Sequence, residues 1–145
     1  SDLGVKAHGM NLGGRYVFPF GSVKFVPALH SSGYEIDDVM TYMGEASGII
    51  LEAEDKKIYH AGDTALFSDM RLFAKDKSID VAFLPIGDNY TMGPEDALQA
   101  VSYLNPKITI PIHYNTFPVI QQNPAIFVEQ VVGGKVLNPG ETILV

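Results

Sequence analysis

The alternation of apolar and polar positions predicts paired strands in the first half of the chain. Runs rich in aromatic and β-branched residues occupy positions 16–20, 23–28, 47–53 and 57–61. Gly21-Ser22 separates the first two runs and Glu54-Asp55-Lys56 the last two, so each pair predicts a hairpin. Residues 31–44 between the hairpins are polar and irregular, and we expect a loop there.

In the second half of the chain, the residue pattern predicts helices as well as strands. Ser68 can cap a helix over 68–75, with Phe67 and Leu72 as a hydrophobic staple. Residues 79–86 are apolar almost throughout, which is typical of a strand buried on both faces. Pro94 and Asn123-Pro124 each favour the start of a helix, the second closed by Gly133-Gly134. Further strands are expected over 107–112, 135–137 and 142–145. This order predicts an α+β sheet covered by helices on at least one face.

Composition narrows the class of protein. Hydrophobic residues make up 46% and charged residues 19% of the 145 residues, which suits one soluble domain. No apolar run reaches the roughly 20 residues that cross a bilayer. The net charge of −7 disfavours nucleic acid as a partner. The absence of cysteine leaves only His and carboxylate side chains as metal ligands and fits a cytoplasmic protein.

Three polar residues lie just after predicted strands and are candidates for metal binding or catalysis. His30 follows 23–28, Asp63 follows 57–61 within Ala61-Gly62-Asp63-Thr64, and His113 follows 107–112. Imidazole and carboxylate are ligands that zinc, manganese and iron accept. Each residue also has an inert interpretation, since a histidine at a strand end is commonly hydrogen-bonded and an aspartate in a turn is commonly a cap. Spacing alone does not bring the three residues together.

A family resemblance adds to this pattern. The segments that carry it are Phe25-Val26-Pro27-Ala28-Leu29-His30-Ser31, Tyr59-His60-Ala61-Gly62-Asp63-Thr64, Pro85-Ile86-Gly87-Asp88, Thr91-Met92-Gly93-Pro94-Glu95 and Ile112-His113-Tyr114. They resemble the metallo-β-lactamase superfamily, in particular its uncharacterised metal-dependent hydrolases related to the ascorbate-6-phosphate lactonases. The resemblance covers nearly the whole chain. It implies the C-terminal portion of an αββα sandwich.

The resemblance also implies roles for single residues, and it shows that one motif of the superfamily is missing. It implies that His30 binds a first divalent metal, His113 a second, and Asp63 bridges both, with zinc or manganese as the ions. His-x-His-x-Asp-His, which supplies the other ligands in that superfamily, does not occur here. We therefore expect residues 1–145 to be a single partial domain that lacks its N-terminal part. Its partner would be that missing segment or a second copy of the chain.

Neighbouring residues are weaker candidates. His60, Thr64 and Asp88 are interpreted as groups that orient the ligands or line the pocket. His8 is interpreted as a structural or surface residue.

The implied activity is hydrolysis of a small-molecule lactone, amide or phosphoester by water or hydroxide that a two-metal centre activates, with the site incomplete and inactive in this chain alone. The main alternative is a non-catalytic module that acts through association. A calcineurin-like metallophosphoesterase ranks lower, because its Gly-Asp-x-x-Asp and Gly-Asn-His patterns are missing.

Overall fold

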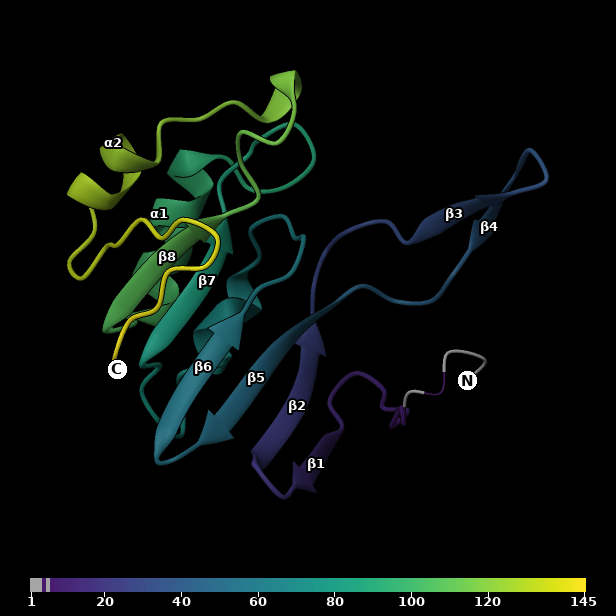
Figure 1. Cartoon of the computed structure of the whole chain (residues 1–145), viewed down its shortest axis with the longest axis horizontal. Helices are drawn as coiled ribbons and strands as arrows, with labels where there is room; N and C mark the ends of the chain where they lie inside the picture. The colour runs from purple at the N-terminus through teal and green to yellow at the C-terminus, as the bar shows by residue number, and fades with distance from the viewer. Residues whose placement is uncertain (1–3, 5) are drawn as a thin grey trace.

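The computed structural model describes Gly4 and residues 6–145, and its centre is a six-stranded sheet (Figure 1). The strand order is β1-β2-β5-β6-β7-β8, and β3 and β4 form a separate two-stranded sheet. The strands are β1 (Arg15–Phe18), β2 (Gly21–Pro27), β3 (Gly33–Ile36), β4 (Val39–Tyr42), β5 (Ser47–Ala53), β6 (Lys56–His60), β7 (Val81–Pro85) and β8 (Ile108–Ile112).

The pairing mode changes once across the large sheet, from antiparallel to parallel. The pairs β1–β2, β2–β5 and β5–β6 are antiparallel, whereas β6–β7 and β7–β8 are parallel. Glu54 and Asp55 link β5 to β6 with φ angles of 48° and 59°. Two successive positive φ angles define the tight turn whose twist matches a hairpin. The second predicted hairpin is therefore confirmed together with its turn. The first hairpin also forms, between β1 and β2, but its turn lies at Pro19 and Phe20 and not at Gly21-Ser22, which begin β2.

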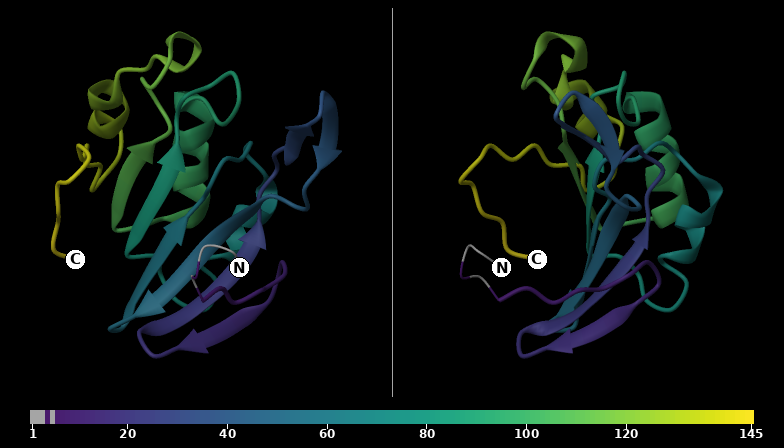
Figure 2. Two further views of the ribbon diagram at one scale, coloured as in Figure 1. Left: turned by 45° about the vertical axis from the view of Figure 1, so that its right-hand side comes forward. Right: turned by 90° about the vertical axis from the view of Figure 1, so that its right-hand side faces the viewer.

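The helices are α1 (Pro94–Leu104), α2 (Pro124–Glu129) and the 3-10 helices η1 (Ser68–Leu72) and η2 (Pro118–Ile120). Helix α1 and η1 cover one face of the sheet, while the C-terminal tail passes over the other (Figure 2). The core lies under α1 and η1. Its fully buried side chains include Tyr59, Met70, Leu84, Met92 and Leu104.

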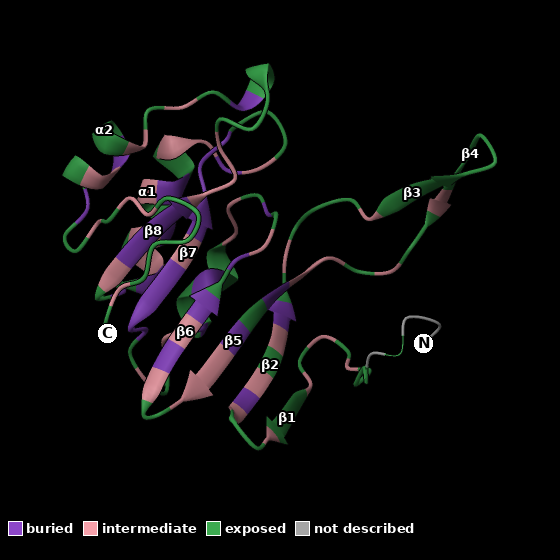
Figure 3. Cartoon of the chain, viewed as in Figure 1, coloured by how far each residue is buried: buried purple, intermediate pink, exposed green. Residues whose placement is uncertain are grey.

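The opposite face of the sheet carries apolar residues that are only partly buried, and Figure 3 shows stretches of intermediate burial along β2, β5, β6 and β7. Phe25, Ile49, Leu51, Ile58 and Phe83 share this face by register. Ile49 is 39% exposed, and the other four are intermediate in burial. Among the described residues, no helix is long and apolar enough to cross a membrane.

Other expectations were wrong. Helix α2 ends at Glu129, before Gly133-Gly134, which was expected to close it. Residues 31–44 contain the β3–β4 hairpin, because Asp37 and Asp38 adopt φ angles of 50° and 60° and close a tight turn. The segment from Ser68 forms only a short 3-10 helix, since Phe67 is its N-cap and no side chain caps it. The tail after Gly134 holds no strand.

Candidate metal centre

Four segments leave the large sheet at the same end. Strand β2 runs in the same direction as β6, β7 and β8, because two antiparallel pairings separate β2 from β6. The segments that follow these strands carry His30, Asp63, Asp88 and His113. The topology therefore gathers the polar residues at one edge, where sheets of this kind commonly build sites.

Thr64 joins two of these segments. Its side chain is fully buried, and its hydroxyl accepts a hydrogen bond from the Leu29 amide at 3.0 Å. The amide of the following residue donates back to the Leu29 carbonyl at 2.9 Å, and the Thr64 carbonyl accepts from the Met92 amide at 3.0 Å. These bonds hold the backbone next to His30 against the turn that carries Asp63. Thr64 was interpreted as a group that orients the ligands or lines the pocket, and its contact across to Leu29 was not predicted.

Gly87 makes room for His113. A Cβ atom at position 87 would collide with the carbonyl oxygen of His113 and lie 3.0 Å from its ring Nδ1. His113 itself has a φ angle of 55°, a left-handed conformation that costs about 1–2 kcal/mol for a residue with a side chain. Such strain persists only where the surroundings enforce it, and it concentrates at functional sites. Nothing in the sequence pattern alone pointed to this role of Gly87.

Asp63 and His113 face each other. The Oδ2 atom of Asp63 lies 3.7 Å from Nε2 of His113, with the two side chains 49% and 23% exposed. This separation exceeds that of a hydrogen bond. The Nδ1 atom of His113 is buried and has no hydrogen-bond partner. Both side chains thus retain capacity to bind a further group.

His30 stands apart from this pair. It is exposed, and its Nδ1 lies 2.7 Å from the carbonyl oxygen of the adjacent Ser31. Within Gly4 and residues 6–145, no three His, Asp or Glu side chains converge on one point. The structure therefore brings Asp63 and His113 together and leaves His30 on a neighbouring segment.

His60 lies beneath the turn that carries Asp63. Its Nδ1 accepts a hydrogen bond from the Gly62 amide at 3.1 Å, and its ring stacks on Phe83 with 5.5 Å between ring centroids. The pKa of His60 is lowered from its ordinary value, mainly because burial desolvates the ring. The nearby carboxylate of Asp63 acts in the opposite direction and raises it. Because Nδ1 is an acceptor, the neutral ring carries its proton on Nε2.

Asp88 lies in the turn that leads into α1. It is exposed and left-handed, with a φ angle of 62°. Its carboxylate accepts from the Asn89 amide at 2.8 Å, and its backbone amide donates to the Met92 carbonyl at 3.0 Å. Asp88 also lines a hollow with Gln122 and the first turn of α1.

The Asp63–His113 pair fits a divalent metal. Two ligands of one tetrahedral zinc ion, each bonded at about 2.0–2.2 Å, stand roughly 3.4 Å apart. The observed 3.7 Å is close to that value, and one carboxylate with one imidazole is a usual donor combination. The pair supplies fewer than the four contacts that zinc normally takes.

Comparison with known proteins agrees with this fold. Residues 1–114 match the family model described as a Beta-lactamase superfamily domain. The chain therefore belongs to the beta-lactamase superfamily, and its α+β fold is that of the metallo-β-lactamases. This membership speaks against the calcineurin-like alternative.

Individual relatives narrow the group. The chain is 96% identical over 142 residues to a UPF0173 metal-dependent hydrolase of Enterococcus faecalis (strain ATCC 700802 / V583), covering 98% of this chain and 63% of the relative. A UPF0173 metal-dependent hydrolase of Bacillus cereus (strain AH187) is 55% identical, with 97% and 63% covered. Igni18, a metallo hydrolase from Ignicoccus hospitalis KIN4/I, superposes with a TM-score of 0.84 at 37% identity, covering 98% of this chain and 62% of that one. The chain thus spans about 63% of the length of the curated relatives it matches.

Proposed function

We propose that the protein is a metal-dependent hydrolase whose centre is built on Asp63 and His113. The observation that carries this proposal is the approach of Asp63 Oδ2 to His113 Nε2 at 3.7 Å, in an accessible position. The names of the relatives support it, since those at 96% and 55% identity are both called metal-dependent hydrolases.

The donor chemistry suits zinc or manganese, and we propose two ions in the complete site. When bound, a divalent metal lowers the pKa of a coordinated water and polarises a carbonyl or phosphoryl oxygen of a lactone, amide or phosphoester. Asp63 contributes the negative charge of the site and His113 a neutral nitrogen. We propose His30 as the third ligand, and Thr64 positions the segment that carries it. His60 supports the turn that carries Asp63.

Metal analysis combined with hydrolysis assays tests this proposal on the protein in its native length. We expect bound zinc or manganese, hydrolysis of at least one substrate class, and loss of both on chelation. His113→Ala should reduce metal content and activity together. His8→Ala is the matched control, because His8 is exposed and its ring packs at a tilt against Tyr16, with 3.9 Å between ring centroids. Equal losses in both variants would contradict the assignment of His113.

A non-catalytic module is the second candidate, favoured by the absence of any three converging ligands among the described residues. In this case the native-length protein would carry no stoichiometric metal and hydrolyse none of the three substrate classes. For residues 1–145 alone we expect well under two metal equivalents after dialysis, because two or three ligands leave each ion short of its usual contacts.

We further propose that another polypeptide covers the apolar sheet face of Phe25, Ile49, Leu51, Ile58 and Phe83. Soluble proteins rarely leave such a contiguous apolar surface in water. The occupant is either a further segment of the protein or a second copy of the chain. Native mass measurement of residues 1–145 should show association. A well-folded monomer of 15.8 kDa would contradict this proposal.

A further inference from the structure

A second candidate site lies at the opposite end of β6 from the metal centre. A cavity of about 420 Å³ opens on the face of the sheet that carries η1. Register places Ser22, Glu52 and Lys57 side by side on β2, β5 and β6, and all three line the cavity. Val26 and Ile50 provide buried apolar surface beside them. We call this the basic cavity.

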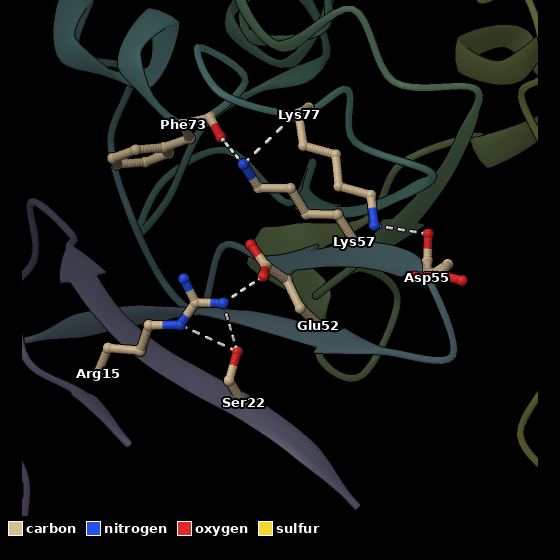
Figure 4. A network of polar contacts seen from close by, with 7 residues as sticks. All are labelled: Arg15, Ser22, Glu52, Asp55, Lys57, Phe73 and Lys77. Carbon is tan, nitrogen blue, oxygen red and sulfur yellow. Dashed lines mark hydrogen bonds and ion pairs between the residues drawn. The ribbon is translucent and has the colours of Figure 1, made fainter. Parts of the chain in front are cut away.

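Its charge is opposite to that of the whole protein. The cavity is lined by the cations Arg15, Lys24, Lys57 and Lys77 and by the carboxylates Glu52 and Asp76, a net charge of +2 in a chain of −7. The guanidinium of Arg15 is fixed in place, because it donates to the hydroxyl of Ser22 at 2.7 and 3.0 Å and pairs with Glu52 (Figure 4). A preorganised cation of this kind suits an anionic ligand.

Lys57 supplies the observation that points most directly to a ligand. The residue is only 5% exposed, and its ammonium donates to the carbonyl oxygens of Phe73 at 2.6 Å and Lys77 at 3.2 Å (Figure 4). Across Gly4 and residues 6–145, no carboxylate lies within 4.0 Å of this ammonium. An ammonium has three donors, so one remains for another partner. Desolvation also lowers its pKa. Buried charges in proteins are ordinarily paired, whereas the carboxylates of Glu52 and Asp76 act on this ammonium only from beyond ion-pair distance.

We propose that the basic cavity binds a small organic phosphate monoester, with its phosphate at Lys57 and Lys24 and its apolar body on Val26 and Ile50. A phosphate monoester carries a charge of about −1.5 to −2 at neutral pH, which matches the net charge of the lining. The site stands on residues other than the proposed metal ligands, so its success or failure is independent of the hydrolase proposal.

Calorimetric titration of the native-length protein with phenyl phosphate and with inorganic phosphate tests this site. Titration before and after metal removal by chelation separates the basic cavity from the metal centre. We expect saturable binding of phenyl phosphate in both forms, tighter than that of inorganic phosphate because of the apolar floor. Lys24→Gln should weaken binding roughly five-fold, the upper end for a partly exposed charge pair. Lys57→Met should weaken it more, with its fold checked by circular dichroism.

Lys135→Gln is the matched control, since it removes an exposed lysine that does not line the cavity. It should leave affinity within a factor of about two. Three results would overturn the proposal: no saturable binding at millimolar phenyl phosphate, loss of binding on chelation, or equal weakening by Lys24→Gln and Lys135→Gln. If Lys57→Met fails to fold, the comparison of Lys24 with Lys135 still decides the question.

Discussion

Asp63 and Asp80 stand at opposite ends of the parallel strands, and their surroundings differ sharply. The side chain of Asp80 is 4% exposed and accepts hydrogen bonds from the Lys57 amide at 2.8 Å and the Lys107 ammonium at 2.7 Å. The side chain of Asp63 is 49% exposed and lies 3.7 Å from His113, beyond hydrogen-bond distance, and it makes no side-chain hydrogen bond within Gly4 and residues 6–145. Asp80 is therefore satisfied by the fold itself, whereas Asp63 has acceptor capacity for a metal. Vacant acceptor capacity, more than charge, distinguishes a candidate ligand from a structural carboxylate.

Removal of the structural carboxylate should have the largest effect on stability. Asp80→Ala leaves the buried Lys57 amide without an acceptor, so the free energy of unfolding should fall by about 3 kcal/mol. Urea unfolding measures the loss. Asp80→Asn keeps an acceptor and should lose clearly less, and equal losses would show that the hydrogen bond to Lys57 is unimportant.

Gly87→Ala should have the next largest effect. The free energy of unfolding should fall by about 2 kcal/mol, because the new methyl group collides with the backbone of His113. The displaced imidazole should also lower metal content in the native-length protein. Gly9→Ala is the control, since a Cβ there meets nothing within 4 Å. Unchanged stability and metal content in Gly87→Ala would contradict the packing described above.

Thr64→Val should lower the free energy of unfolding by about 1 kcal/mol, because the Leu29 amide loses its acceptor while the shape of the side chain is kept. Thr64→Ser retains the hydroxyl and should preserve the bond. In the native-length protein, the Val variant should also bind metal less tightly if His30 is a ligand. A Ser variant as impaired as the Val variant would exclude the hydroxyl as the cause.

Acid should weaken the Asp80 end of the strands in a defined window. The hydrogen bond from Lys107 is the main cause that lowers the pKa of Asp80 in the folded state. Its contribution is therefore complete above the unfolded pKa of about 3.9 and disappears as pH falls through the folded value. Stability measured by urea unfolding should drop more steeply below about pH 4 in the wild type than in Asp80→Asn. Parallel pH profiles would contradict this assignment.

Asp63→Asn should have the smallest effect on stability, within about 0.5 kcal/mol, because the side chain makes no hydrogen bond that the fold requires. Its effect should fall on function, with metal content and hydrolysis both reduced in the native-length protein. A large loss of stability together with full metal content would reverse the contrast between the two aspartates.

The sequence predicted much of the large sheet because its signals were local. The apolar run before Ile86, the helix start at Pro94 and the turn at Glu54-Asp55 each specify their own element. The β3–β4 hairpin was missed because Asp37-Asp38 was interpreted as part of a polar loop, although both residues adopt the positive φ angles of a hairpin turn.

The candidate site could be predicted from the sequence only in part. Strand-end positions indicated Asp63 and His113, but their separation depends on how three strands align. The hydroxyl of Thr64 bonds a backbone amide 35 residues away, and Gly87 is required by a carbonyl group rather than by its own conformation. Local sequence signals do not encode such tertiary contacts.

The β3–β4 hairpin projects away from the six-stranded sheet (Figure 1), and Tyr34, Val39 and Met40 on it are each more than 60% exposed. A two-stranded ribbon is only marginally stable in water by itself. Its residues should open and reclose independently of the six-stranded sheet, with faster amide hydrogen exchange than β5 or β6. His30 is attached where this ribbon leaves β2, so any surface that clamps the ribbon also restricts the imidazole. Ordering of the β3–β4 hairpin and placement of His30, the proposed third ligand, are thereby linked.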